Sequence, residues 1–233
     1  MSANFTTIET TRLRLRHFRD SDLPAFIAYR NDPEVAKYQS WEGISEPEAY
    51  AFLQEQKGTQ PGVPGQGMQI AIEFKETGML IGDCYFTIND HDERQAEIGY
   101  TLSRACQGQG FATEAISCLL TYAFVTFHLH RIIAITDCEN AASVALLERL
   151  GMRCEGHFLQ NVWFKGKWGD EYLYAIASTH MHEAGSGALG LLTACSLWQL
   201  VINKAKVRTN LPQSLEWRLK ARTRRNSFAS YRF

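Results

Sequence analysis

Residues Gln95 to Phe127 read QAEIGYTLSRACQGQGFATEAISCLLTYAFVTF, and this stretch decides the fold. It predicts a strand over 97–102, a sharp turn that carries Gly108 and Gly110, and a long helix that begins at Phe111. Glycine lets the backbone approach a ligand closely. The first turn of a helix has amide N–H groups without intrahelical partners, and its dipole favours negative charge. The stretch therefore predicts an anion cradle, most often one for phosphate.

The composition describes a globular chain with one unusual end. Apolar residues make up 45% and charged residues 21% of 233 positions, which suits a packed core and excludes global disorder. The net charge of −1 conceals an asymmetry. Residues 180–233 hold nine Lys and Arg against two Asp and Glu, whereas residues 1–179 hold 15 against 23. We therefore expect an acidic domain over 1–179, for which nucleic acid is not an obvious partner, and a basic C-terminal extension over 180–233.

The extension departs from the rest of the chain in character. Its basic stretch, 218–225, would attract RNA, a membrane surface or an acidic partner. An extension without a selected fold explains the same composition equally well.

The cysteines and the apolar segments bear on the compartment. The six cysteines, which form no CxxC pair and no grouping typical of a metal site, are Cys84, Cys106, Cys118, Cys138, Cys154 and Cys195. The N-terminus has no apolar segment of the kind found in signal peptides, and the longest apolar run, 188–202, is too short and interrupted for a membrane span. We expect a cytoplasmic protein with reduced thiols and no membrane span.

Periodicity and turn residues predict the element order β-α-α-β-β-β-α-β-α-β-β. The alternating residues 11–16 predict a half-buried strand whose arginines point outward, and residues 45–48 (SEPE) predict a capping box that opens a helix. Further strands are expected at 68–74, 79–88 and 131–135, a helix at 140–150, and a final hairpin at 152–164 and 168–178. This order mixes hairpins with two right-handed crossovers, so we expect an α/β (α+β) fold with about seven strands and about four helices.

Two familiar nucleotide motifs fail at the glycine turn. A P-loop needs a lysine in GxxxxGK[ST], and none follows Gly110 at that position. The dinucleotide fingerprint GxGxxG needs a third glycine where Thr113 stands, and its strand should open the fold rather than come fourth. The phosphate ligand is therefore of another kind.

The turn does fit the pattern (Q/R)xxGx(G/A) at residues 107–112. Other blocks accompany it: Thr10-Thr11-Arg12-Leu13-Arg14-Leu15-Arg16, Glu97-Ile98-Gly99-Tyr100, Ala112-Thr113-Glu114-Ala115, Asn140-Ala141-Ala142-Ser143-Val144, Leu147-Glu148-Arg149-Leu150-Gly151-Met152 and Glu155-Gly156. In combination they resemble the GNAT N-acyltransferase superfamily, in its RimJ/RimL branch, which is named for ribosomal-protein-alanine acetyltransferases. The resemblance covers roughly residues 7–178.

The resemblance implies a GNAT fold with a mixed, mostly antiparallel sheet, and acetyl-CoA as co-substrate without a metal. It places the pyrophosphate on the backbone N–H groups of 107–113, the pantetheine arm along the strand at 100–102, and Asn140 against the cofactor arm. The cofactor-binding residues that it implies are Tyr100, Thr101, Leu102, Gln107, Gly108, Gln109, Gly110, Phe111, Ala112, Thr113 and Asn140.

Acetyl transfer to an amine needs a neutral amine and a stabilised leaving thiolate. Glu97, on the key strand just before the cofactor-pairing residues, is the candidate base. The alternative for Glu97 is a solvent-facing strand residue or a salt bridge to Arg94 or Arg131. Ser143 stands where the branch carries a serine proposed as general acid to the CoA sulfur, and the alternative is a residue that packs behind Asn140 as N-cap.

The acceptor side is the least defined part of the sequence. Tyr38 and Trp41 lie in a loop where the family shapes its acceptor site, so they are the candidate substrate-binding residues, although aromatic packing on the core fits as well. The histidine pairs at 128/130 and 180/182 lack partners at metal spacing, and no metal site is expected.

The resemblance implies an N-acetyltransferase that transfers acetyl directly, in a ternary complex, to a primary amine. A protein N-terminus is the first acceptor and a small amine the second. A CoA-binding sensor or partner protein without turnover is the alternative from another class. A homodimer is compatible with the chain.

Overall fold

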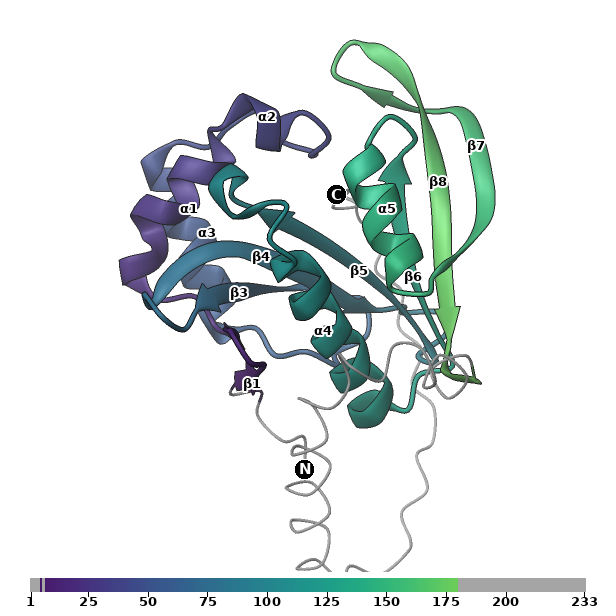
Figure 1. The fold of residues 1–233 in the computed structure, drawn as a ribbon, viewed down its shortest axis with the longest axis horizontal. Helices are drawn as coiled ribbons and strands as arrows, with labels where there is room; N and C mark the ends of the chain where they lie inside the picture. The colour runs from purple at the N-terminus through teal and green to yellow at the C-terminus, as the bar shows by residue number, and fades with distance from the viewer. Residues whose placement is uncertain (1–4, 6, 180–233) are drawn as a thin grey trace, which may run out of the picture.

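A mixed eight-stranded sheet forms the frame of the protein (Figure 1). The computed structural model describes residue 5 and residues 7–179, so the basic extension expected over 180–233 lies outside the described residues. The strands are β1 (Thr7–Glu9), β2 (Leu13–Arg16), β3 (Met68–Phe74), β4 (Met79–Ile88), β5 (Gln95–Leu102), β6 (Arg131–Asp137), β7 (Arg153–Phe164) and β8 (Lys167–Ala177). The α-helices within the described residues are α1 (Leu23–Arg30), α2 (Pro33–Ala36), α3 (Glu46–Gly58), α4 (Phe111–Phe127) and α5 (Ala141–Arg149).

The sheet is split at the boundary between β5 and β6. Its order is β1-β2-β3-β4-β5-β6-β8-β7, and β5–β6 is the one parallel pair among neighbours that are otherwise antiparallel. The β5–β6 register runs only from Gln95↔Arg131 to Glu97↔Ile133, although β5 continues to Leu102 and β6 to Asp137. Beyond Glu97 the two strands diverge, as Figure 1 shows.

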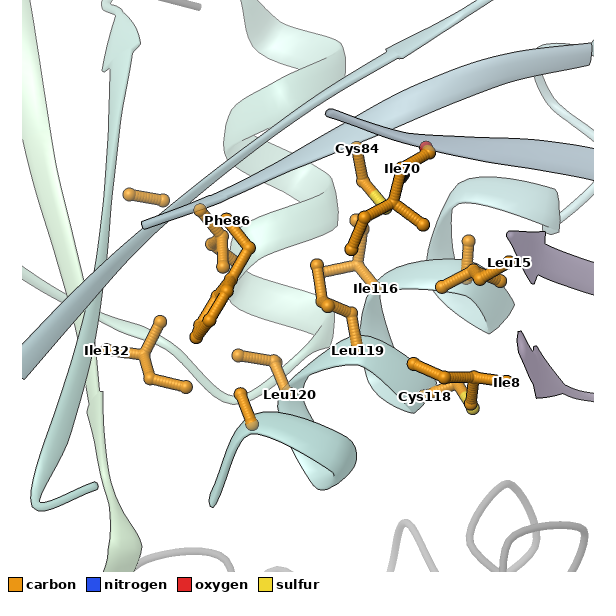
Figure 2. Packing of buried hydrophobic residues seen from close by; sticks show 14 of the residues in the cluster. Ile8, Leu15, Ile70, Cys84, Phe86, Ile116, Cys118, Leu119, Leu120 and Ile132 are labelled. Atoms are coloured by element: carbon orange, nitrogen blue, oxygen red, sulfur yellow. Dashed lines mark hydrogen bonds between the residues drawn. The ribbon is translucent and has the colours of Figure 1, made fainter. Parts of the chain in front are cut away.

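The long helix α4 covers one face of the sheet. Figure 2 shows Ile116, Leu119 and Leu120 of α4 packed among side chains from the strands, such as Phe86 of β4 and Ile132 of β6. These side chains are almost completely removed from water. Burying apolar side chains of this size contributes roughly 1.5–3 kcal/mol each to stability, so this cluster fixes the glycine turn that precedes α4 against the sheet.

The opposite face is covered by α1 and α3 over the first half of the sheet. Their cluster includes Phe26 of α1 and Leu53 of α3, packed against Ala71 of β3 and Leu80 of β4. Phe26 also stacks on Phe52, with ring centroids 5.3 Å apart. The protein therefore has two separate apolar layers, one on each face.

The expected α/β architecture is confirmed, with two elements that the pattern missed. Strand β1 and helix α2 are only three and four residues long, so neither gives a periodic signal, and the totals become eight strands and five helices in the described residues. The capping box at the start of α3 is confirmed, since Glu48 accepts the backbone N–H of Ser45 at 2.9 Å.

The outward orientation expected for the arginines of the first predicted strand is wrong for Arg16. Its side chain is buried and pairs with Asp22 and Glu73.

Candidate active site

The turn before α4 has the conformation that an anion cradle needs. Gly108 and Gly110 adopt φ angles of +73° and +80°, which side chains other than glycine rarely adopt. The first helical hydrogen bond runs from Glu114 N–H to Gly110 O at 3.0 Å. The N–H groups of residues 111–113 therefore have no intrahelical partner and form the positive end of the helix dipole.

The side chains of the turn are engaged in structural contacts. Gln107 donates to the carbonyl of Leu102 at 3.1 Å, and Gln109 donates to the carbonyl of Ala105 at 2.8 Å. The Phe111 ring packs on Phe74, with centroids 5.2 Å apart. The backbone, rather than these side chains, is therefore the part of residues 107–113 that suits an anion.

Two arginines flank this helix start, and the sequence reasoning missed both as site residues. Arg12 donates to the carbonyl of Gln109 at 3.1 Å and forms a salt bridge to Glu114 at 2.6 Å. Arg149 of α5 donates to Thr113 Oγ1 at 3.3 Å. These contacts bring two guanidinium groups to the N-terminal end of α4, and Glu114 balances the charge of Arg12 there.

The open edge of β5 lies next to the cradle. Ser103 N–H donates to Ile81 O of the β4 side, so by strand alternation Thr101 also directs its backbone to β4, whereas Tyr100 and Leu102 direct theirs toward the β6 side. The β5–β6 register has already ended at this point. Of the three residues expected to pair with a cofactor arm, Tyr100 and Leu102 are therefore the two whose backbone faces the open side, although the Leu102 carbonyl already accepts a hydrogen bond from Gln107.

Two of the predicted site residues, Tyr100 and Ser143, meet on the side of the sheet that α4 covers. The hydroxyl groups of Tyr100 and Ser143 are 2.7 Å apart. Asn140 is the N-cap of α5, as expected from the sequence, and its side chain accepts a hydrogen bond from the N–H of Ser143 at 3.1 Å. Burial raises the pKa of Tyr100 well above its ordinary value, so its hydroxyl stays protonated and donates hydrogen bonds.

Glu97 lies on the other face of β5. Its neighbours Ala96 and Ile98 point into the α4 cluster, so Glu97 points to the face that α1 and α3 cover elsewhere in the sheet. It is half-buried and sits at the last paired register, opposite Ile133. The arginines considered as its partners pair with other carboxylates: Arg94 with Asp92, and Arg131 with Glu155.

The loop that carries Tyr38 and Trp41 connects the two halves of the sheet. Trp41 donates to the carbonyl of Arg30 at 3.2 Å, and its ring lies 3.6 Å from the Arg30 guanidinium. Tyr38 donates to the carbonyl of Glu139, between β6 and α5, at 3.0 Å. Lys165, in the β7–β8 turn, donates to the carbonyl of Ala36 at 2.6 Å. The segment around this loop therefore contacts residues on both sides of the boundary between β5 and β6.

Residue 5 and residues 7–179 contain no grouping typical of a metal site and no helix that could span a membrane. No three His, Cys, Asp or Glu side chains gather there in a way that would hold a metal ion. In the same part of the chain, no helix combines the length and apolar character that a membrane span requires.

Known proteins are similar to this chain in sequence and in fold. Residues 12–153 match the family described as "Acetyltransferase (GNAT) domain". The chain is 35% identical to the uncharacterized N-acetyltransferase p20 of Bacillus licheniformis over 170 residues, which are 73% of this chain and 95% of that protein. It is also 35% identical to the [ribosomal protein uS5]-alanine N-acetyltransferase of Escherichia coli over 123 residues, 46% of this chain and 62% of that protein.

A solved structure agrees with the sequence relatives. The crystal structure of a GNAT-family acetyltransferase from Bacillus anthracis superposes with a TM-score of 0.66 and 31% identity, and the match covers 74% of this chain and 98% of that one. The GNAT fold expected from the sequence is therefore confirmed, as is the likeness to the ribosomal-protein-alanine branch. The chain belongs to the GNAT acetyltransferase family.

Proposed function

We propose that the protein transfers acetyl from acetyl-CoA directly to a primary amine. The observation that carries this proposal is that the N-terminal end of α4 lies next to the open edge of β5, so that one extended cofactor could contact both. The N-terminal end of α4, with Arg12 and Arg149 beside it, suits the phosphates of CoA. The open β5 edge at Tyr100 and Leu102 leads from there to the hydroxyl pair of Tyr100 and Ser143.

The groups that take part in the transfer lie on opposite faces of β5. Acetyl-CoA supplies the acetyl group as a thioester. On one face, the nitrogen of a neutral amine bonds to the acetyl carbon as Glu97 takes up the proton that this nitrogen loses, while the carbon–sulfur bond breaks and its electron pair stays on the sulfur. On the other face, one hydroxyl of the Tyr100–Ser143 pair donates to the other, and the second donates a hydrogen bond to the sulfur as it gains negative charge.

The acceptor we propose is a protein N-terminus or a small amine. The excess of acidic residues over 1–179 favours a cationic acceptor of either kind. Thiol release from acetyl-CoA is measured across an alanine-leading peptide, a free amino acid, a polyamine and an aminoglycoside. Tight CoA binding without release on any amine would instead support a sensor.

Ser143→Ala is expected to lower kcat by about 10- to 1000-fold and to leave the affinity for CoA nearly unchanged. Tyr100→Phe is expected to lower kcat as well. The losses in the double variant should be less than additive, because the two hydroxyl groups form one hydrogen-bonded pair. Ser117→Ala, on α4, is the matched control. A wild-type kcat in Ser143→Ala would contradict the role.

Arg12→Gln is expected to weaken CoA binding about threefold to tenfold, because a positive charge beside the Gln109 carbonyl is removed. Calorimetric titration with CoA measures the change. Arg94→Gln, which removes an arginine paired with Asp92 at a distant turn, is the control and should bind CoA like wild type. Equal affinities in both variants would exclude Arg12 from the site.

A protein that ends at Ser178 is expected to bind CoA with the affinity of the full chain. The contacts of the donor side lie within the described residues, and Ser178 N–H already bonds to His130 O just after β8. Titration of both proteins with CoA tests the boundary. A tenfold or larger loss on truncation would show that residues 180–233 belong to the cofactor site.

A further inference from the structure

A segment from the first half of the sheet reaches across the split on the face to which Glu97 points. Val35 of α2 belongs to the apolar cluster on this face, opposite α4. Three residues later, Tyr38 donates its hydroxyl hydrogen to the carbonyl of Glu139, which follows β6, at 3.0 Å. Residues 35–38 therefore cross from the helices that cover β3 and β4 to the end of β6.

A second contact spans the split from the other side. Lys165 and Gly166 form the two-residue turn of the β7–β8 hairpin, with φ angles of +48° and +80°. Two positive φ angles are typical of the tight turns that join twisted strands, so the hairpin fixes where Lys165 begins. Its ammonium group donates to the carbonyl of Ala36 at 2.6 Å. Desolvation lowers the pKa of Lys165 at this contact, and the negative charge of Glu42 opposes the change.

The two contacts bound the split at its wide end. At the narrow end, Glu97 and Ile133 are the last register pair of β5 and β6. From Ile133, β6 continues to Asp137, which is roughly 13 Å at the rise of a strand. Part of this length is taken by side chains, since Ile135 and Asp137 alternate with residues of the α4 cluster and so project to the Glu97 face. An extended strand needs about 4.8 Å beside its neighbour and a helix about 10–12 Å, so the split suits a single extended chain.

We propose that Tyr38 and Lys165 determine specificity by restricting the acceptor to an amino group at the end of a single extended chain. We call their two contacts, Tyr38 to Glu139 and Lys165 to Ala36, the clasp. The clasp borders the way from the Glu97 face to the open edge of β5, so an amino group on a helix or another folded surface is kept out. The inference rests on the proposed function, since it narrows the amines that take part in that reaction.

Amide hydrogen exchange over residues 33–44 tests the clasp without turnover. The double variant Tyr38→Phe with Lys165→Met lacks both donors, so the protected amides of this segment should exchange at least threefold faster than in the wild type. Lys167→Met is the matched control, because it removes a lysine of the same hairpin whose partner, Glu139, lies on its own side of the split. An unchanged exchange rate in the double variant, or an equal increase in Lys167→Met, would overturn the clasp.

Two peptides of one sequence measure the selection itself. One is linear and begins with alanine, and the other is held helical by a side-chain cross-link. The wild type should prefer the linear peptide, and the ratio of the two kcat/KM values should fall about threefold to tenfold in Lys165→Met. Lys165→Arg, which restores a donor, should recover the preference, and CoA affinity should stay near wild type throughout. An unchanged ratio in Lys165→Met, or an equal loss of kcat/KM with both peptides, would refute the selection.

The two proposals fail in different ways. The absence of thiol release with every amine would refute the acetyl-transfer proposal, while hydrogen exchange would still decide whether the clasp holds the segment. Release with small amines but with neither peptide, or equal use of the linear and the helical peptide by the wild type, would refute the selection and leave the transfer proposal standing.

Discussion

Glu97→Gln is expected to lower kcat by about 10- to 1000-fold while the affinity for CoA stays near wild type. Glutamine keeps the size of the side chain and one acceptor oxygen but does not accept a proton at neutral pH. Glu97 lies on the face of β5 opposite the Tyr100–Ser143 pair, so the substitution leaves the donor side intact. Initial rates of thiol release at saturating amine and a CoA titration measure the two quantities.

The pH profile separates a base from a merely structural carboxylate. In the wild type, kcat should fall at low pH as the base is protonated, and this acidic limb should be lost or displaced in Glu97→Gln. Glu93→Gln, an exposed glutamate just before β5, is the matched control. If Glu97→Gln retains the wild-type kcat and acidic limb, the base is another group and the assignment is wrong.

The elements that could be predicted are those with local signals. The capping box at Ser45, the β3–β4 hairpin and the strand–turn–helix around Gly110 each depend on residues a few positions apart. Their existence and approximate bounds follow from periodicity and turn chemistry alone. The same is true of the glycine conformations, since positive φ angles at Gly108 and Gly110 are what a sharp strand-to-helix turn requires.

The rest of the site depends on contacts between distant parts of the chain. Arg12 reaches Gln109 across 97 positions, and Tyr100 reaches Ser143 across 43. Strand alternation predicts that two residues lie on opposite faces of the sheet, but it does not show which helix will cover each face. For this reason the sequence predicted roles for Glu97 and Ser143 but left open that Glu97 and the Tyr100–Ser143 pair lie on opposite faces of β5.

Arg16 shows the same limit of sequence-based prediction, now for a residue that stabilises the fold. Alternation predicts that its side chain leaves the core, and it does leave the α4 layer. On the opposite face, however, it meets Asp22 at 2.7 Å and Glu73 at 2.5 Å. Glu73 also binds Arg14 and Arg19, so one carboxylate that is 1% exposed holds three arginines together where β2, β3 and the segment before α1 meet.

Glu73→Gln is therefore expected to lower the free energy of unfolding by about 1.5–3 kcal/mol, the range for hydrogen bonds to charged groups. The variant leaves Arg16 buried with Asp22 as its remaining charged partner in the network. Urea unfolding followed by circular dichroism measures the change. Glu76→Gln, in the exposed β3–β4 turn, is the control and should change stability by less than about 0.5 kcal/mol.

The pH dependence of this difference tests whether charge is its cause. Burial alone would raise the pKa of Glu73, but hydrogen bonding and charge from Arg16, with the charges of Arg19 and Arg14, outweigh it and leave that pKa below its ordinary value of 4.5. A carboxylate with a lowered pKa stabilises the fold fully above the unfolded-state pKa, and this stabilisation is lost as the pH falls through the folded-state pKa. The stability gap between wild type and Glu73→Gln should accordingly be constant near neutral pH and should narrow below about pH 4.5. A gap that stays constant into the acidic range would show that packing around residue 73, and not its charge, stabilises this corner of the sheet.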